Sequence, residues 1–232
     1  MKRAFSWIYA TAAGLAFISS AQAATFIVTD GGNATFVASQ TTNAGEKVVT
    51  FNGAAPAGTV VTLNDGASVV SGSSSGQYAQ PFGSDTSPYL SVFGGSSATV
   101  SDITGVGYNG LSFYLGSIDT YNVVDILSTT GALIASYTGS AFLGGTSGDQ
   151  TLPTTNRLIS FTREANDPLF GGVTFRSSQN SAEIDNVRFL SPSAVPEPAT
   201  WLTMLLGFGF LGAAMRRKKT ATHGRQDTLA FS

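Results

Sequence analysis

The chain has 232 residues, of which 42% are hydrophobic and 11% are charged, and its formal net charge is −2. It has no cysteine and a single histidine, His223, so disulfide bonds, Cys–His catalysis and zinc sites built from Cys and His are excluded. Residues 24–195 carry five cations against twelve carboxylates, a balance of about −7 that disfavours nucleic acid as a partner.

The first segment is typical of a secretory signal peptide. Two cations precede an apolar run from residue 4 to 18, and Ala21 and Ala23 form an A-x-A cleavage site. The alternative, a retained membrane anchor, would need a longer apolar run without small residues at its end. We therefore expect a signal peptide over 1–23 that is removed after Ala23.

Short apolar clusters separated by turn formers follow the signal peptide. Clusters of β-branched and aromatic residues lie at 26–28, 36–37, 48–51, 60–63 and 69–70. Glycine, asparagine and aspartate between the clusters are typical turn residues. This spacing predicts an all-β sandwich or barrel, and we expect the exported β-sandwich domain to cover 24–191.

Residues 71–88 are rich in serine, glycine and proline and predict a long surface loop. The loop is the candidate for ligand binding, and Tyr78, Phe82 and Tyr89 are candidate aromatic platforms for a sugar. The alternative is a disordered connector without a role.

The second half of the chain has a sharper strand pattern. Alternating apolar residues predict a half-buried strand over 110–116. Further strands are expected at 121–127 and 132–137, which form a hairpin, at 158–162 and 173–175, joined by the turn 163–168, and at 182–190. In the last strand the apolar phase changes at Asp185 and Asn186. A β-bulge there would bring the apolar residues on both sides of it to one core face.

The C-terminal segment is apolar and is followed by charge. A proline-rich linker over 192–198 leads into an uncharged run over 199–215, and a basic tail over 216–232 follows. The run is at the lower limit for a helix that crosses a hydrocarbon core of ~30 Å, and the cations indicate a cytoplasmic end. We expect one transmembrane helix over 199–215, with His223 in the cytoplasmic tail. Ser-His-Asp catalysis is then excluded for the exported domain.

This end of the chain resembles the PEP-CTERM sorting signal of Gram-negative bacteria, in its PEPxxWA form. The resemblance is carried by Pro196, Glu197, Pro198, Trp201, the Gly-Phe-Gly of 207–209, Arg216, Arg217, Lys218 and Lys219. In that family the segment holds a secreted protein in the inner membrane until an exosortase, a membrane cysteine protease-transpeptidase, processes it. The resemblance implies an anchored precursor with a periplasmic domain that later reaches the cell surface or extracellular matrix. Leu202, in place of the usual Ala, and the tail after the basic cluster depart from the pattern.

A second resemblance joins residues 110–124 to residues 182–190. They are similar to a theme of many PEP-CTERM surface proteins, in which a strand ending in a G-S-x-D-x-Y-N turn pairs with a closing F-E-x-D-N strand. The likeness implies a jelly-roll-like antiparallel sandwich and implies no reaction. Ala182 stands here in place of the phenylalanine of the closing motif.

Four polar side chains at the ends of these two pieces are candidates for a calcium site: Asp119, Asn122, Asp185 and Asn186. Calcium takes oxygen ligands from such side chains, and it often pins the loops of secreted β-sandwiches. The alternative is that the same side chains cap turns and the bulge by bonding backbone amides. No other cofactor is expected.

Paired carboxylates are the remaining route to catalysis. Asp119 with Asp125, or Glu183 with Asp185, could form the pair that glycoside hydrolysis requires, about 5–10 Å apart. Carboxylates on an acidic surface reach such distances by chance, so we expect no enzymatic activity.

The sequence thus favours a non-catalytic exported protein associated with exopolysaccharide or the cell envelope, able to bind carbohydrate. An extracellular carbohydrate-active enzyme and a purely structural matrix protein are the alternatives. The expected partners are an exosortase, the inner membrane before processing, and polysaccharide.

Overall fold

The computed structural model describes residues 24–144, 147–192 and 198–219. The chain divides into two compact units, Met1–Ser193 and Ala194–Ser232, which are described separately. The signal-peptide prediction, including Ala21 and Ala23, lies outside the described residues.

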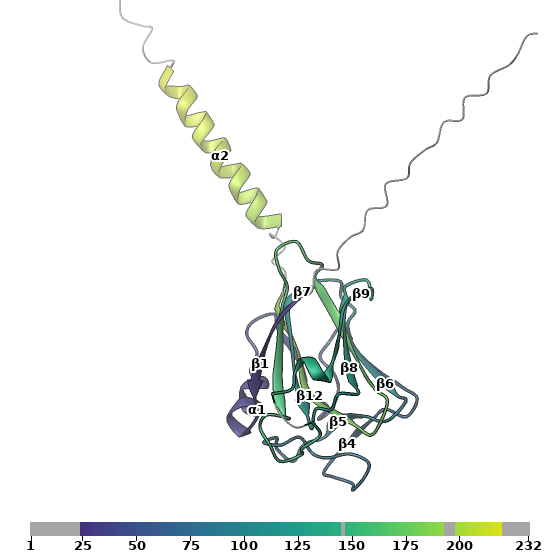
Figure 1. Cartoon of the computed structure of the whole chain (residues 1–232). Coiled ribbons are helices and arrows are strands. Elements are labelled where there is room, and N and C mark those ends of the chain that lie inside the picture. The colour runs from purple at the N-terminus through teal and green to yellow at the C-terminus, as the bar shows by residue number, and fades with distance from the viewer. Residues whose placement is uncertain (1–23, 145–146, 193–197, 220–232) are drawn as a thin grey trace, which may run out of the picture. The chain divides into compact units, whose positions relative to one another are not determined.

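The first unit is an antiparallel β-fold, as predicted (Figure 1). Its strands are β1 (Thr25–Asp30), β2 (Lys47–Val49), β3 (Thr59–Asn64), β4 (Ser68–Val70), β5 (Tyr89–Val92), β6 (Ser97–Asp102), β7 (Tyr108–Gly116), β8 (Asn122–Ser128), β9 (Leu133–Thr138), β10 (Arg157–Thr162), β11 (Phe170–Ser177) and β12 (Ala182–Pro192). The helices of this unit are α1 (Asn33–Ser39) and the short 3-10 turn η1 (Gly139–Ala141).

The strands form two layers of one hydrogen-bonded sheet. One layer runs β9-β8-β11-β6-β3, and the other contains β1-β10-β7-β12 with β5, β4 and β2 beyond β12. The link between β11 and β7 is the single pair Phe170 and Tyr108. This arrangement agrees with the predicted sandwich, while the jelly-roll assignment stays a prediction.

Aromatic side chains fill the space between the layers. Phe113 of β7 packs edge-on against Phe175 of β11, with ring centroids 4.9 Å apart, and Phe161 of β10 lies 6.0 Å from Phe113. These three rings are at most 1% exposed. Burial of such large rings is the main stabilising contribution of this layered fold.

The predicted bulge in the last strand is confirmed. The register of β12 against β7 shifts between Asp185 and Arg188, and Asn186 has a φ of 50°. The apolar residues on both sides of the bulge then face the same core: Ala182, Ile184, Val187 and Phe189. The predicted hairpin of β8 and β9 is also present.

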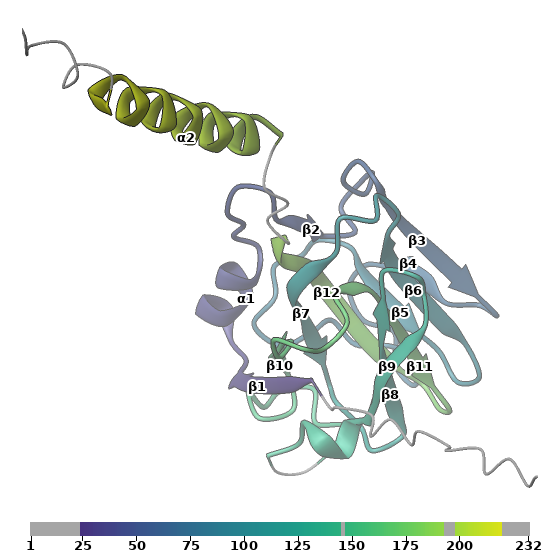
Figure 2. The same cartoon turned by 90° about the horizontal axis from the view of Figure 1, so that it is seen from above.

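The prediction of a half-buried strand over 110–116 is wrong, because β7 is covered on both faces. Ser112 and Tyr114, on the face away from the core, are fully buried. Figure 2 shows α1 beside β1 and β7, outside this layer. Phe36 of α1 packs edge-on against Tyr114, with centroids 5.2 Å apart.

One further strand prediction needs correction. The cluster 36–37, predicted as a strand, is part of the helix α1, in which Phe36 is buried and Val37 is 52% exposed. Two neighbouring apolar residues are too few to distinguish the period of a helix from that of a strand. Strands β5 and β6 were not predicted at all. The strands predicted at 158–162 and 173–175 are confirmed as β10 and β11, which lie in different layers.

The second unit contains α2 (Pro198–Lys219), which confirms a C-terminal helix. Its apolar side chains with described placement are strongly exposed within the unit: Met204, Leu205, Leu206, Phe208, Phe210, Leu211 and Met215. Among the described residues, none of the helices combines enough length and apolarity to cross a membrane. The predicted transmembrane role of 199–215 is therefore not confirmed.

Candidate functional site

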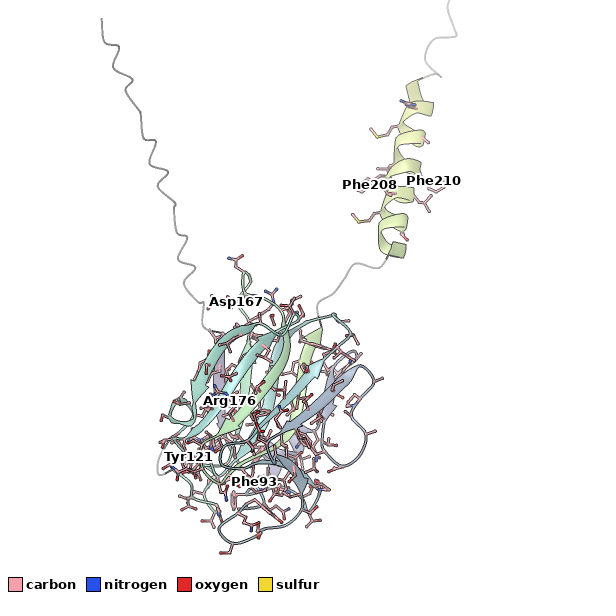
Figure 3. All side chains as sticks on the ribbon, turned by 90° about the vertical axis from the view of Figure 1, so that its right-hand side faces the viewer. Phe93, Tyr121, Asp167, Arg176, Phe208 and Phe210 are labelled. Carbon is pink, nitrogen blue, oxygen red and sulfur yellow. The ribbon has the colours of Figure 1, made fainter. Side chains whose placement is uncertain are left out.

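The two motif pieces noted in the sequence meet at one end of the sandwich. The turn after β7 and the first residues of β12 line a cavity of about 170 Å³. Its lining includes Tyr78, Ser117, Asp119, Tyr121, Asn180 and Glu183. In Figure 3, Tyr121 and Phe93 lie at this end of the domain, whereas Asp167 lies at the other. We call this hollow the Asp119 cavity.

Glu183 lines the Asp119 cavity and is almost fully buried. It is 1% exposed and accepts hydrogen bonds from the Ser117 and Ser181 hydroxyls and from the backbone N–H of Ala79, the last at 3.1 Å. Burial raises the pKa of Glu183 to about 7, and the nearby Asp119 adds to the shift, although the three hydrogen bonds oppose it. The carboxyl is thus held by donors from three segments.

Asp119 is held in position by hydrogen bonds within its own turn. Its backbone N–H donates to Asn122 Oδ1 at 2.7 Å, and one of its carboxylate oxygens accepts the Tyr121 hydroxyl. Gly148 lies directly against this carboxylate: a Cβ there would be 2.7 Å from Asp119 Oδ1, and its φ is +69°. Only glycine satisfies both conditions without strain.

Asn156 connects the loops around the cavity, a role that no motif or local pattern in the sequence indicates. It is fully buried, and its Oδ1 accepts the backbone N–H groups of Phe82 at 2.9 Å and Ser117 at 3.0 Å. Its Nδ2 donates to the carbonyls of Asp149 and Leu152. One amide therefore fixes three segments that are distant in sequence.

A second, larger hollow lies on the other side of Tyr121. It measures about 480 Å³ and is lined by Gly95, Ser96, Ser97, Tyr121, Val123, Arg176, Ser177 and Ser178. We call it the Arg176 groove. The Arg176 side chain is half exposed and binds Asp125 through Nε at 2.7 Å and a terminal nitrogen at 3.0 Å. Burial alone would raise the pKa of Asp125, but bonds from Arg176 and Ser136 hold it below its usual value.

The predicted calcium residues separate into two pairs with different surroundings. Asp119 and Asn122 share one turn, where the Asn122 amide donates to Ser177 Oγ at 3.1 Å. Asp185 accepts the backbone N–H of Asn186 at 2.7 Å, and the Asn186 amide donates to the Ser39 hydroxyl. These are the contacts expected of groups that cap turns and bulges.

No group of three or more His, Cys, Asp and Glu side chains in the described segments could hold a metal ion. Asp185 is 1% exposed, and burial raises its pKa to about 8, with a smaller contribution from Asp85. A carboxyl that retains its proton is a poor calcium ligand. The calcium site stays a prediction without support from this geometry.

The carboxylates pair differently from the sequence prediction. Asp125 is engaged by Arg176, and Asp185 lies at the bulge, so neither joins its predicted partner in the cavity. Instead Asp119 and Glu183, from the two predicted pairs, line the same hollow.

The three aromatic residues predicted as sugar platforms differ in burial and in position. Tyr89 is 1% exposed and donates its hydroxyl to the Gly72 carbonyl at 2.6 Å, so it is wrong as a platform. Tyr78 lines the Asp119 cavity and packs edge-on against Phe93 at 6.0 Å. Phe82 is 37% exposed. Tyr121, which is not among the predicted platforms, borders both hollows.

The sorting segment is the remaining functional region. Pro196 and Glu197 lie outside the described residues, whereas Pro198 begins α2, which also contains Trp201 and the cations 216–219. Residues 194–218 match the PEP-CTERM protein-sorting motif. The chain carries a PEP-CTERM sorting motif. The motif implies an exported precursor that is processed by an exosortase. No curated protein matches the chain.

Proposed function

We propose that this protein is a non-catalytic surface or matrix protein whose exported β-domain associates with extracellular polysaccharide after an exosortase has processed its C-terminal segment. In the precursor, α2 crosses the inner membrane, the domain lies in the periplasm and the basic residues remain in the cytoplasm.

The observation that carries the proposal is the position of the sorting motif relative to the fold. The motif begins at residue 194, directly after β12 (Ala182–Pro192), which pairs with β7, β5 and β2. The last strand of the domain therefore ends before the sorting segment starts. Processing within that segment would remove no strand of the described sheet.

The polar hollows beside Tyr121 support the carbohydrate part of the proposal. Sugar recognition combines an aromatic face with polar groups placed for hydroxyls, and ligand sites are concave with a few fixed polar groups. The Asp119 cavity offers a carboxylate, amides and tyrosine hydroxyls.

The test replaces Pro196, Glu197 and Pro198 by alanine in an exosortase-carrying Gram-negative host. We expect the unchanged chain in the surface and matrix fraction, and the triple variant as an unprocessed form in the inner membrane. Ser193→Ala, just outside the matched residues, is the control and should behave like the unchanged chain. Equal distribution of the triple variant and the control would contradict the proposal.

The carbohydrate part has its own measurement in the same host. In a strain without exopolysaccharide the protein should appear in the culture medium instead of the matrix. Retention in the cell-bound fraction of that strain would contradict polysaccharide association.

A carbohydrate-active enzyme is the second candidate, favoured by one observation. Asp119 and Glu183 line one cavity, and Glu183 has its pKa raised to about 7, the property of a general acid in glycoside hydrolysis. Against it, the Glu183 carboxyl is almost fully buried and already accepts three hydrogen bonds. Release of reducing sugar from matrix polysaccharide, abolished by Glu183→Gln, would establish the enzyme instead.

A further inference from the structure

We infer that the Asp119 cavity and the Arg176 groove form one binding site, with Tyr121 between them, for a segment of a neutral polysaccharide. This inference rests on the proposed polysaccharide association and adds the place of binding and the class of sugar.

Tyr121 is the element shared by the two hollows. It lines both, and its hydroxyl donates to Asp119 and lies 3.0 Å from the carbonyl of Asn180, which fixes the ring from two sides. Burial and the neighbouring Asp119 raise the pKa of Tyr121 above its usual value, so the hydroxyl keeps its proton at neutral pH. A fixed ring between two hollows is suited to stack on a sugar unit that extends from one hollow into the other.

The Asp119 cavity has polar groups that the fold does not use. Asp119 Oδ1 and the side chains of Gln77 and Gln150 make no hydrogen bond within the described residues, although all three residues line the cavity. A carboxylate oxygen accepts sugar hydroxyls, and the two amides both donate and accept. The hollow thus offers acceptors and donors to a ligand rich in hydroxyl groups.

The sizes of the two hollows indicate that the polysaccharide is bound at its end or along a short stretch of sugar units. The Asp119 cavity, at about 170 Å³, lies below the ~300–1,000 Å³ of sites for drug-sized ligands and fits a single sugar unit. The Arg176 groove, at about 480 Å³, has room for the next units. Its serine hydroxyls, from Ser96, Ser97 and Ser178, offer further partners.

The charges of the site favour a neutral sugar over an acidic one. The Arg176 guanidinium is compensated by the two bonds to Asp125, while the described residues that line the Asp119 cavity include two acids and no cation. The domain around the site is also acidic, with five cations against twelve carboxylates over 24–195. A uronate would meet repulsion at Asp119 without a free cation to offset it.

The test measures binding of the full chain, purified in detergent from an exosortase-free host, to an array of neutral oligosaccharides and their uronate-containing counterparts. Two variants address the two hollows: Gln77→Ala with Gln150→Ala removes unused amides from the cavity, and Ser178→Trp fills the groove. Gln179→Ala is the matched control, because Gln179 is an exposed glutamine of the adjacent loop that lines neither hollow.

We expect neutral glycans to bind, the double variant to lose affinity by about tenfold, as for one or two lost hydrogen bonds, and Ser178→Trp to lose binding. The control should match the unchanged chain. Preference for uronates would overturn the neutral class. Neutral binding that is equal in all variants would overturn the site while leaving polysaccharide association intact. Absence of any glycan binding by the unchanged chain would overturn both.

Discussion

Strands β7 and β12 lie side by side and have two buried faces of opposite character. On the core face, Leu115 lies opposite Ile184 and Leu111 opposite Phe189. On the outer face, Tyr114 lies opposite Asp185, and Glu183 lies opposite Gly116. The core face is apolar and packs against the other layer, whereas the outer face is polar and is covered by α1 and by the loop 71–88.

The two faces are stabilised by different physics. The core face depends on close packing, which tolerates no missing volume. The outer face depends on hydrogen bonds to most of its buried polar groups, because a buried polar group without a partner costs free energy. The Ser112 hydroxyl is an exception and has no partner within the described residues. Since the candidate site stands on the outer face, the loops that carry its polar groups are positioned by specific hydrogen bonds as well as by ring contacts such as that of Tyr78 with Phe93.

Phe113→Ala should give the largest effect, because it removes a fully buried ring of the core face. We expect the free energy of unfolding to fall by about 3–5 kcal/mol, measured by chemical denaturation. Phe113→Leu, which keeps most of the volume, should cost clearly less. Equal and small losses for the two variants would show that the space between the layers is not close-packed.

The pH dependence of stability reports on the outer face. Glu183 and Asp185 have pKa values raised by burial to about 7 and about 8, so the folded chain holds protons that the unfolded chain has released above about pH 4.5. Stability should therefore decrease as pH rises from about 5 to about 8. Below that window it should decrease again, as Asp102 and Asp125, whose pKa values are lowered, take up protons.

Asp185→Asn separates the contribution of Asp185 to the pH dependence of stability from that of Glu183. The amide is neutral at every pH, so this variant should lose part of the fall in stability between pH 5 and 8, with a melting temperature above that of the unchanged chain at pH 8. Asp65→Asn, at an exposed turn, is the control and should keep the full slope. An unchanged slope in Asp185→Asn would contradict the burial of a protonated carboxyl there.

Tyr114→Phe tests a single hydroxyl of the outer face, which makes two hydrogen bonds. The hydroxyl accepts the backbone N–H of Gly32 at 3.0 Å and donates to the carbonyl of Phe82 at 2.5 Å. Its loss should cost about 1–2 kcal/mol in chemical denaturation, since both backbone groups lose a partner. A neutral result would mean that water replaces both bonds, and that the outer face is less tightly closed than its hydrogen bonds indicate.

The smallest effect is expected from removing the sorting segment. Truncation after Ser193 leaves every described strand in place, so the far-UV circular dichroism and the melting temperature should not change. Substitution of the cations 216–219 by neutral residues should likewise leave the domain unchanged and weaken only its retention in the inner membrane. Unfolding or aggregation of the truncated chain would make α2 a structural part of the domain.

The core face was accessible from the sequence, and the outer face was not. Alternation over 110–116 and the phase change at 185–186 identify the core residues of β7 and β12, because the side-chain period of a strand is two. The same rule assigns Tyr114 to solvent, yet it is buried by Phe36 and by the loop that contains Phe82. Tyr114 is covered by residues that are 78 and 32 positions away in the sequence, so no local sequence pattern around Tyr114 indicates its burial.

The site was predictable in part for the same reason. The G-S-x-D-x-Y-N turn and the closing strand, taken from the resemblance, include Asp119, Tyr121 and Glu183, which line the cavity. The role of Asn156 depends on two backbone amide and two backbone carbonyl groups that only the folded chain brings together. Tyr89 was misassigned, because strand β5 around it was not recognised.

Delivery of the folded domain by removal of its terminal segments, as proposed above, is tested by the intact mass of the protein from a host with its exosortase and from the same host without it. We predict that both forms begin at Ala24 and that only the exosortase-containing host yields a chain lacking residues 199–232. A chain that still ends at Ser232 in both hosts would contradict the claim.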